Sequence, residues 1–178
     1  MTREAMTQML RREMVPALGC TGPTAYALAA ACCRPHLTGE VTGMDVYVSP
    51  AFLKIGFGVA TPGTPEPGIA IASAIGLLGG DMTRGLEVLE SAVPEDVKRA
   101  HEMVEEGKVR VLCDWEQTGV YVRAEVQTHK ERVAAVVAGT HDGIQGVWVD
   151  GRPVLENPPA SEELTEEEAG LNLEMIFD

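Results

Sequence analysis

Length, composition and charge already limit what this sequence can be. The chain has 178 residues, enough for one domain, and its net charge of −13 argues against nucleic acid or an anionic membrane surface as a partner. With 45% hydrophobic but only 4% aromatic residues, its core must be built from small aliphatic side chains. Residues 1–8 are largely polar, and apolar runs are shorter than the about 17 residues that a membrane span needs, so we expect a cytoplasmic protein.

An amphipathic helix opens the chain. It should end before Pro16, which lacks an N–H and disfavours helix at the preceding residue. A wholly apolar helix follows over residues 25–33, and a helix without a polar face is a buried helix. Thr21 is predicted as its N-cap, and Pro23 suits its first turn. The apolar face of the first helix is formed by Met6, Met9, Leu10 and Met14.

Cys20 stands directly before the start of the buried helix. Unpaired N–H groups and the helix dipole favour negative charge at such a position, which makes a thiolate available as a nucleophile or a metal ligand. The alternative is a small buried hydrophobe at a turn.

The middle of the chain offers two features that suit an anion. A strand is predicted over residues 41–49, ending at Ser49. Lys54 follows inside an apolar stretch, where a lysine either extends its ammonium group to water or serves an anionic group. The Pro- and Gly-rich loop 60–68 leads into a second apolar helix over residues 69–78, whose free N–H groups could hold a carboxylate. The alternative for this loop is a stiff connection without a ligand.

Two more helices and a sheet complete the predicted domain. Thr83 is expected to cap one helix, and Pro94 begins another that Gly107 closes. From Lys108 the apolar period changes to two, which indicates strands that the segment 41–49 can join. These strands cover residues 109–113, 120–126 and 133–138, followed by a hairpin over 147–155 around Asp150-Gly151. We predict a single-domain α+β fold in which buried Ala- and Gly-rich helices pack against an antiparallel sheet.

His141 lies between the third of these strands and the hairpin. A histidine flanked by small residues at a strand end is suited to proton transfer near neutral pH, and the alternative is a loop histidine without a chemical role. Cys32 and Cys33 end the buried helix and Cys113 lies in a strand, so packing is the role expected for these three thiols.

We place the domain at residues 1–157. Residues 158–178 then form an acidic tail. The tail contains seven acidic residues and no basic one, and it ends in a cluster of large apolar side chains. Such a segment is either disordered or a docking element for another chain, and we expect docking. The chain is therefore expected to form an oligomer.

Several short motifs follow one another in order between residues 13 and 157. They include Val15-Pro16-Ala17-Leu18-Gly19-Cys20-Thr21-Gly22-Pro23, Val48-Ser49-Pro50 with Leu53-Lys54-Ile55-Gly56, Pro62-Gly63-Thr64, and Gly139-Thr140-His141. In this order they resemble motifs in the N-terminal half of the iron–sulfur-dependent L-cysteine desulfidases, relatives of the α chain of bacterial L-serine dehydratase.

The resemblance implies a lyase of amino-acid catabolism that eliminates sulfide or water from a small amino acid such as L-cysteine or L-serine. It also implies a [4Fe–4S] cluster with Cys20 as a ligand, and Lys54 and His141 as the catalytic residues. The substrate-binding residues that it implies are Thr21, Ser49, Gly63 and Thr64.

Because the resemblance covers one half of that family's length, it implies a second polypeptide that carries the C-terminal half and completes the cluster. The chain alone should then be inactive. The alternative is a non-catalytic relative that binds a small amino acid or a partner protein. Gly22 and Ile55, which replace the family's glutamate and asparagine, would explain that alternative.

Overall fold

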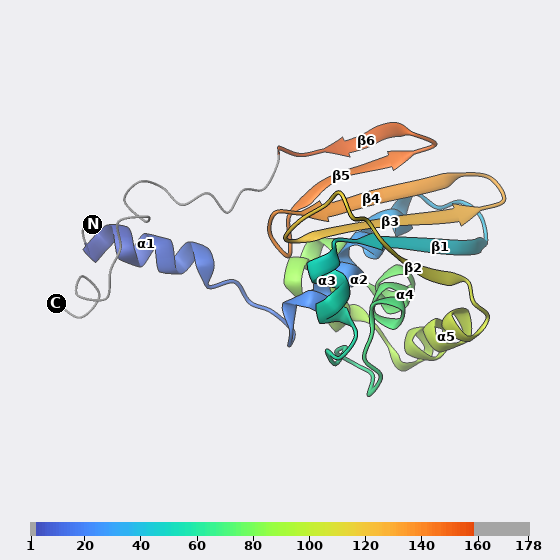
Figure 1. Ribbon diagram of the computed structural model, residues 1–178, viewed down its shortest axis with the longest axis horizontal. Coiled ribbons are helices and arrows are strands. Elements are labelled where there is room, and N and C mark those ends of the chain that lie inside the picture. Colours follow the sequence, from blue (N-terminus) through green and yellow to red (C-terminus); the bar gives the residue numbers. More distant parts are fainter. Residues whose placement is uncertain (1–2, 159–178) are drawn as a thin grey trace.

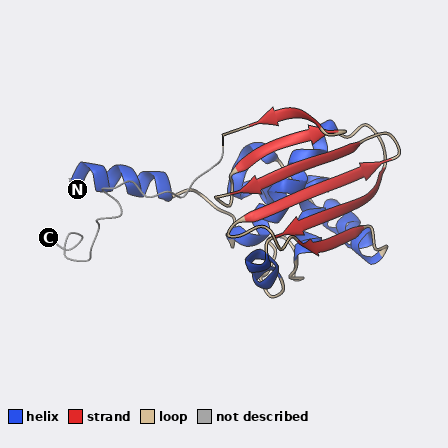
Figure 2. Ribbon diagram, turned by 45° about the horizontal axis from the view of Figure 1, so that its top comes forward, coloured by secondary structure: helices blue, strands red, loops and turns tan. Residues whose placement is uncertain are grey.

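Six strands form one sheet in the spatial order β2-β1-β3-β4-β5-β6, and helices pack on one of its faces (Figure 1; Figure 2). The computed structural model describes residues 3–158. The strands are β1 (Val41–Val48), β2 (Val109–Cys113), β3 (Tyr121–Thr128), β4 (Arg132–Ala138), β5 (Ile144–Val149) and β6 (Arg152–Glu156). The helices are α1 (Arg3–Glu13), α2 (Thr21–Cys33), α3 (Pro50–Gly56), α4 (Ile69–Gly79) and α5 (Pro94–Glu105), with 3₁₀ segments η1 (Arg34–His36) and η2 (Met82–Ser91). The predicted single-domain α+β fold is confirmed.

The sheet is antiparallel except at one edge, where β2 runs parallel to β1. Met44 pairs with Val109, and Val48 pairs with Cys113. The chain leaves β1 and returns to β2 through α3, α4, η2 and α5, and a crossover of this kind brings the second strand back in the same direction. The expectation of a wholly antiparallel sheet is wrong at this edge, because strand periodicity does not specify which strand becomes the neighbour.

Small residues allow α2 and α4 to lie in close contact beneath the sheet. A methyl group added at Gly76 would lie 2.2 Å from the carbonyl oxygen of Ala27. Every residue of α2 from Gly22 to Cys33 is buried. Close approach of the two backbones fills the space that large side chains fill in other cores, which explains how a chain with few aromatic residues builds a dense interior. The two predicted buried helices are confirmed.

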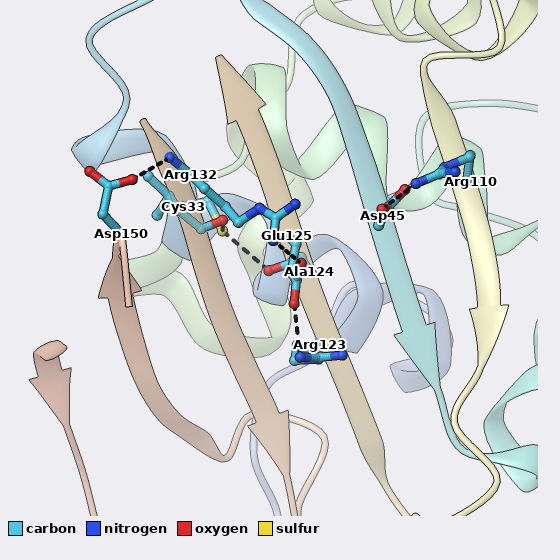
Figure 3. Close-up of polar contacts among 9 residues, drawn as sticks. Cys33, Asp45, Arg110, Arg123, Ala124, Glu125, Arg132 and Asp150 are labelled. Atoms are coloured by element: carbon cyan, nitrogen blue, oxygen red, sulfur yellow. Dashed lines mark hydrogen bonds and ion pairs between the residues drawn. The ribbon is translucent and has the colours of Figure 1, made fainter. Parts of the chain in front are cut away.

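The cysteines at the end of α2 belong to this core. Neither Cys32 nor Cys33 has exposed surface, and burial raises the pKa of the Cys32 thiol to about 12. Burial also raises the pKa of Cys33, with smaller contributions from Cys32 and Glu125. The Cys33 sulfur lies 3.8 Å from the carbonyl oxygen of Ala124 (Figure 3). The packing role predicted for this pair is confirmed, and Cys113 lies in strand β2 as expected.

The face of the sheet opposite the helices carries charged side chains in close pairs. Arg110 on β2 donates to both carboxylate oxygens of Asp45 on β1, at 2.7 and 2.5 Å (Figure 3). Arg123 pairs with Glu125 at 2.8 Å, and its guanidinium carbon lies 4.1 Å from the ring centroid of Tyr47. These contacts satisfy charges that lie partly sheltered from water on this face.

The segment after α4 differs from its prediction. Asp81, not Thr83, is the N-cap of η2, because its carboxylate accepts the backbone N–H of Thr83 at 3.0 Å. Gly85 has a φ of +53°, which interrupts helical geometry and leaves a kinked 3₁₀ segment in place of the expected helix. The predicted hairpin turn is confirmed, with φ values of 48° at Asp150 and 78° at Gly151.

Helix α1 stands away from the sheet and its covering helices (Figure 1; Figure 2). Residues 14–20 connect it to α2. Within residues 3–158, no helix combines the length and apolarity that a membrane crossing requires. The tail predicted to dock on another chain lies beyond Pro158, outside the described residues.

Candidate functional site

The starts of α2 and α4 meet around the short helix α3. A methyl group added at Gly22, in the first turn of α2, would lie 3.6 Å from the Ile55 side chain of α3. The next residue of α3, Gly56, packs directly against Ile69 at the start of α4. The loop between α3 and α4 also reaches this end, since a methyl group at Gly19 would lie 3.4 Å from Pro62. The fold therefore gathers the segments that carry Cys20, Lys54 and the 60–68 loop.

Cys20 is the N-cap residue of α2, with φ −76° and ψ 133°, and it is exposed. The prediction of Thr21 as the cap is wrong: Thr21 is the first helical residue, because Gly19, at φ +77°, turns the chain one residue earlier. No side chain caps this helix start, nor that of α4 at Gly68. Both helices therefore present free N–H groups, which favour a negatively charged group.

The rings of Tyr26 and Phe52 connect α2 to His141. The hydroxyl of Tyr26 on α2 donates to the carbonyl oxygen of Phe52 on α3 at 2.7 Å, and the two rings meet edge to face with centroids 5.6 Å apart. The ring of His141 lies on the same phenylalanine, at a centroid distance of 5.5 Å. Burial, and to a smaller extent the nearby Cys20, raises the pKa of Tyr26. His141 is thus fixed by an aromatic contact that also supports α3.

Neither Tyr26 nor Phe52 was predicted as part of a functional site. A signal for Tyr26 was present: a lone phenol inside an otherwise apolar helix must find a hydrogen-bond acceptor when it is buried. For Phe52 no local signal exists, because its two ring partners come from residues far away along the chain.

Ser49 and Lys54 lie at opposite ends of α3. Ser49 is fully buried; its hydroxyl donates to the carbonyl of Gly119 at 2.7 Å and accepts the N–H of Phe52 at 3.3 Å. These bonds give Ser49 a clear role as the cap of α3, and its substrate-binding role stays a prediction. Lys54 is exposed in the last turn of the helix.

A histidine of α5 holds the loop that contains Gly63 and Thr64. His101 Nδ1 lies 3.2 Å from the Glu66 carboxylate, and Nε2 lies 3.4 Å from the Thr64 hydroxyl. The Thr64 oxygen also accepts the Glu66 N–H at 3.2 Å. In the neutral ring these partners place the proton on Nδ1, so the hydroxyl donates to Nε2. This set of hydrogen bonds fixes the loop, and no local pattern predicts it, because His101 lies far from the loop along the chain.

The thiols do not gather into a cluster site. Cys32 and Cys33 face the core, and Cys113 lies on the edge strand β2, which leaves Cys20 as the thiol at this end. Among residues 3–158, no group of three or more His, Cys, Asp or Glu side chains is arranged to hold a metal ion. A [4Fe–4S] cluster needs several cysteine ligands, so the described residues do not fit a complete cluster.

A depression of about 460 Å³ lies at the opposite end of α2, near its last turn. Its lining includes Arg34, Asp81 and Asp96, none of which was predicted as a site residue. Cys20 and Lys54, by contrast, are exposed on the surface. The predicted site is therefore an open surface, and this depression, which is itself open to solvent, lies elsewhere.

These features define an α+β protein with an exposed thiol at an uncapped helix start. No family model matches the chain. It is similar to a UPF0597 protein of Photobacterium profundum, with 36% identity over 96% of this chain and 41% of the relative. A UPF0597 protein of Oleidesulfovibrio alaskensis is 40% identical over 84% of this chain and 35% of the relative. A UPF0597 protein of Latilactobacillus sakei is 33% identical over 96% of this chain and 41% of the relative. The chain thus spans about two-fifths or less of the length of each of these three relatives.

The comparisons correct the family predicted from the motifs. The similarity to proteins named UPF0597 covers nearly the whole chain, and none of these relatives carries the name of an iron–sulfur lyase. The resemblance to the L-cysteine desulfidase and L-serine dehydratase family is therefore wrong as an identification. Short motifs around glycine, proline and cysteine recur for reasons of backbone geometry, so they identify a family less securely than similarity over the whole chain.

Proposed function

We propose that the end of the molecule around Cys20 is one part of a lyase site, at which a small amino acid such as L-cysteine or L-serine undergoes β-elimination. The observation that supports this most directly is the exposed thiol at the uncapped start of α2. A thiol at such a position can act as a nucleophile or as a metal ligand.

β-Elimination breaks the Cα–H bond and the bond from Cβ to sulfur or oxygen. A base removes the α-proton, the electron pair forms the Cα–Cβ double bond, and sulfide or hydroxide leaves with a proton from an acid. The resulting enamine hydrolyses to a keto acid and ammonia. Such a site needs a proton-transfer group and a binding place for the substrate carboxylate.

The residues near α3 supply candidates for both needs. We assign proton transfer to His141, whose ring rests on Phe52. Lys54 and the free N–H groups at the start of α4 are assigned to the carboxylate, because both carry positive charge or partial positive charge. Thr21, Gly63 and Thr64 are proposed as further contacts to the substrate.

A [4Fe–4S] cluster could be held here only together with ligands from a partner polypeptide. Cys20 would be the one thiolate ligand from this chain, and at least two more would have to come from another polypeptide. No step above is routed through a cluster. When bound, such a cluster would act as a Lewis acid toward the leaving group.

A second candidate function is binding without catalysis. At the contact between α2 and α3, the buried Gly22 lies beside the side chain of Ile55. A reaction at this place would need polar groups. An apolar contact at this place favours a chain that binds a small amino acid or a partner protein and performs no chemistry.

We propose that the protein acts in the cytoplasm and as an oligomer. The four free thiols support this setting, since disulfides are rare in reducing compartments.

The test measures keto acid, ammonia and sulfide formation from L-cysteine and L-serine. The chain is co-expressed, under anaerobic conditions, with a neighbouring gene product that matches the rest of the UPF0597 length. We expect Cys20→Ala to lower the rate at least about a hundredfold, because it removes the thiolate on which the site depends. Cys113→Ser is the matched control, since it changes a thiol on β2, and it should leave the rate unchanged.

Undiminished turnover by Cys20→Ala would overturn the lyase proposal. If the wild-type complex shows no turnover but its melting temperature rises with millimolar L-cysteine or L-serine, the second candidate function is supported instead.

A further inference from the structure

Large apolar side chains are exposed around Cys20. Met14 and Phe57 are each 75% exposed, Val15 48%, Ile55 45% and Leu18 36%. We call these five residues the apolar rim. They make up five of the nine large exposed hydrophobic residues found within residues 3–158. Single exposed apolar residues are ordinary on a protein surface, but a concentration in one region marks an interaction site.

Two short segments supply the rim, and both adjoin the candidate site. Residues 14–18 lie in the connection that leads from α1 into Cys20. Ile55 and Phe57 lie at the end of α3, where Ile55 meets the first turn of α2. Leu18 donates its N–H to the carbonyl oxygen of Leu86 at 3.2 Å, and Ile55 and Phe57 form the end of helix α3. The rim is therefore presented by anchored backbone.

The length of the relatives indicates what covers the rim. UPF0597 proteins that match nearly the whole of this chain are about two and a half times as long, since the match covers only 41% of them. A segment of that size has surface enough to bury the rim and the open site beneath it. Cys20 and Lys54 are both exposed, so a covering segment would also enclose a substrate bound between them.

We infer that the apolar rim is the docking surface for a polypeptide that corresponds to the remaining three-fifths of the UPF0597 relatives. That polypeptide closes over Cys20 and completes the site from the other side. The inference rests on the proposed function only for the location of the site. The exposure of the rim and the length of the relatives support the interface independently.

The experiment co-expresses the tagged chain, residues 1–178, with the polypeptide from the same genome that matches the remaining part of the relatives, whether one gene or two encode the two parts. The two polypeptides should co-purify as a stable complex. Ile55→Glu and Phe57→Glu should each weaken the complex at least about tenfold in Kd, because each places a charge in a buried apolar contact. Val154→Glu on β6, where the native side chain is 49% exposed, is the matched control and should leave Kd unchanged. Circular dichroism checks that each variant is folded.

The outcomes separate this inference from the proposed function. Failure of the two polypeptides to co-purify, or equal weakening by Val154→Glu, would overturn the docking surface. So would a homodimer of the chain that Phe57→Glu dissociates, because the occupant would then be a second copy. A complex that forms through the rim yet shows no lyase activity would support the interface and refute the lyase.

Discussion

The hydroxyl of Tyr26 and the carbonyl oxygen of Phe52 lie 2.7 Å apart, and this hydrogen bond joins α2 to α3 beneath the candidate site. Both residues are buried, so neither polar group can turn to water if the bond is lost. The bond sets the position of α3, and α3 carries Lys54 and supports the ring of His141.

Tyr26→Phe should therefore lower the free energy of unfolding by about 1–2 kcal/mol, because it leaves the Phe52 carbonyl buried without its partner. Urea unfolding followed by circular dichroism measures the change. Tyr47→Phe is the control, since that ring lies on the opposite face of the sheet, and we expect a change within about 0.5 kcal/mol. Equal effects of the two substitutions would show that the Tyr26 hydroxyl contributes nothing particular.

Gly76→Ala should destabilise the fold by roughly 2–3 kcal/mol. The new methyl group would lie 2.2 Å from the Ala27 carbonyl oxygen, and this overlap forces α2 and α4 apart. The gain in helix propensity, at most about 1 kcal/mol, does not offset it. Gly58→Ala is the matched control, because nothing lies within 4 Å of its added methyl group. Thermal unfolding measures both, and a neutral Gly76→Ala would contradict the close helix contact.

Acid should remove a contribution that Glu131 makes to stability. Hydrogen bonds from the Thr38 backbone N–H and then from the Thr38 hydroxyl hold the pKa of this carboxyl below its ordinary value of 4.5. Since the folded state has the lower pKa, the contribution is complete above about pH 4.5 and is lost as pH falls through the folded-state pKa. The difference in unfolding free energy between wild type and Glu131→Gln should thus shrink between pH 7 and pH 3. Glu105→Gln, at an exposed position on α5, should show no such trend.

Cys20 should be the first thiol to react with iodoacetamide at neutral pH. It is exposed at a helix start, whereas Cys32 and Cys33 have no exposed surface and burial raises the pKa of Cys32 to about 12. Mass spectrometry of partly labelled protein gives the order of modification, and Cys20→Ser should abolish the fast phase. Labelling of Cys113 at the same rate as Cys20 would show that exposure alone, without the helix start, governs reactivity.

His101→Leu should loosen the 60–68 loop. It removes both ring contacts, to the Glu66 carboxylate and to the Thr64 hydroxyl, while α5 stays intact. We expect the Glu66 amide to exchange with solvent several-fold faster in hydrogen–deuterium exchange. Lys98→Gln, an exposed position on the same helix, should leave exchange of that amide unchanged. Unaltered exchange in His101→Leu would mean that the Pro- and Gly-rich loop is rigid without the histidine.

Local signals in the sequence predicted most of the elements. Apolar residues without a polar face indicated that α2 and α4 are buried, and Asp150-Gly151 indicated the hairpin, because each signal depends on backbone geometry within a few residues. The position of Cys20 directly before α2 was predicted in the same way, whereas the choice between an exposed and a buried thiol was left open. The cap of α2 was misplaced by one position, since a cap is decided by the turn that precedes it. The helix expected after Thr83 is instead the kinked 3₁₀ segment η2, which Asp81 caps.

The tertiary structure decided what no local pattern contains. The parallel pairing of β2 with β1 depends on a crossover of four elements, and the contact of His141 with Phe52 joins residues that periodicity cannot relate. The sequence alone determined that α2 and α4 are buried helices and where a thiol meets a helix start, since these follow from side-chain chemistry and spacing. Which segments become neighbours, and which apolar residues remain uncovered around Cys20, follows from long-range packing, because that packing is selected by the fit of whole elements to one another.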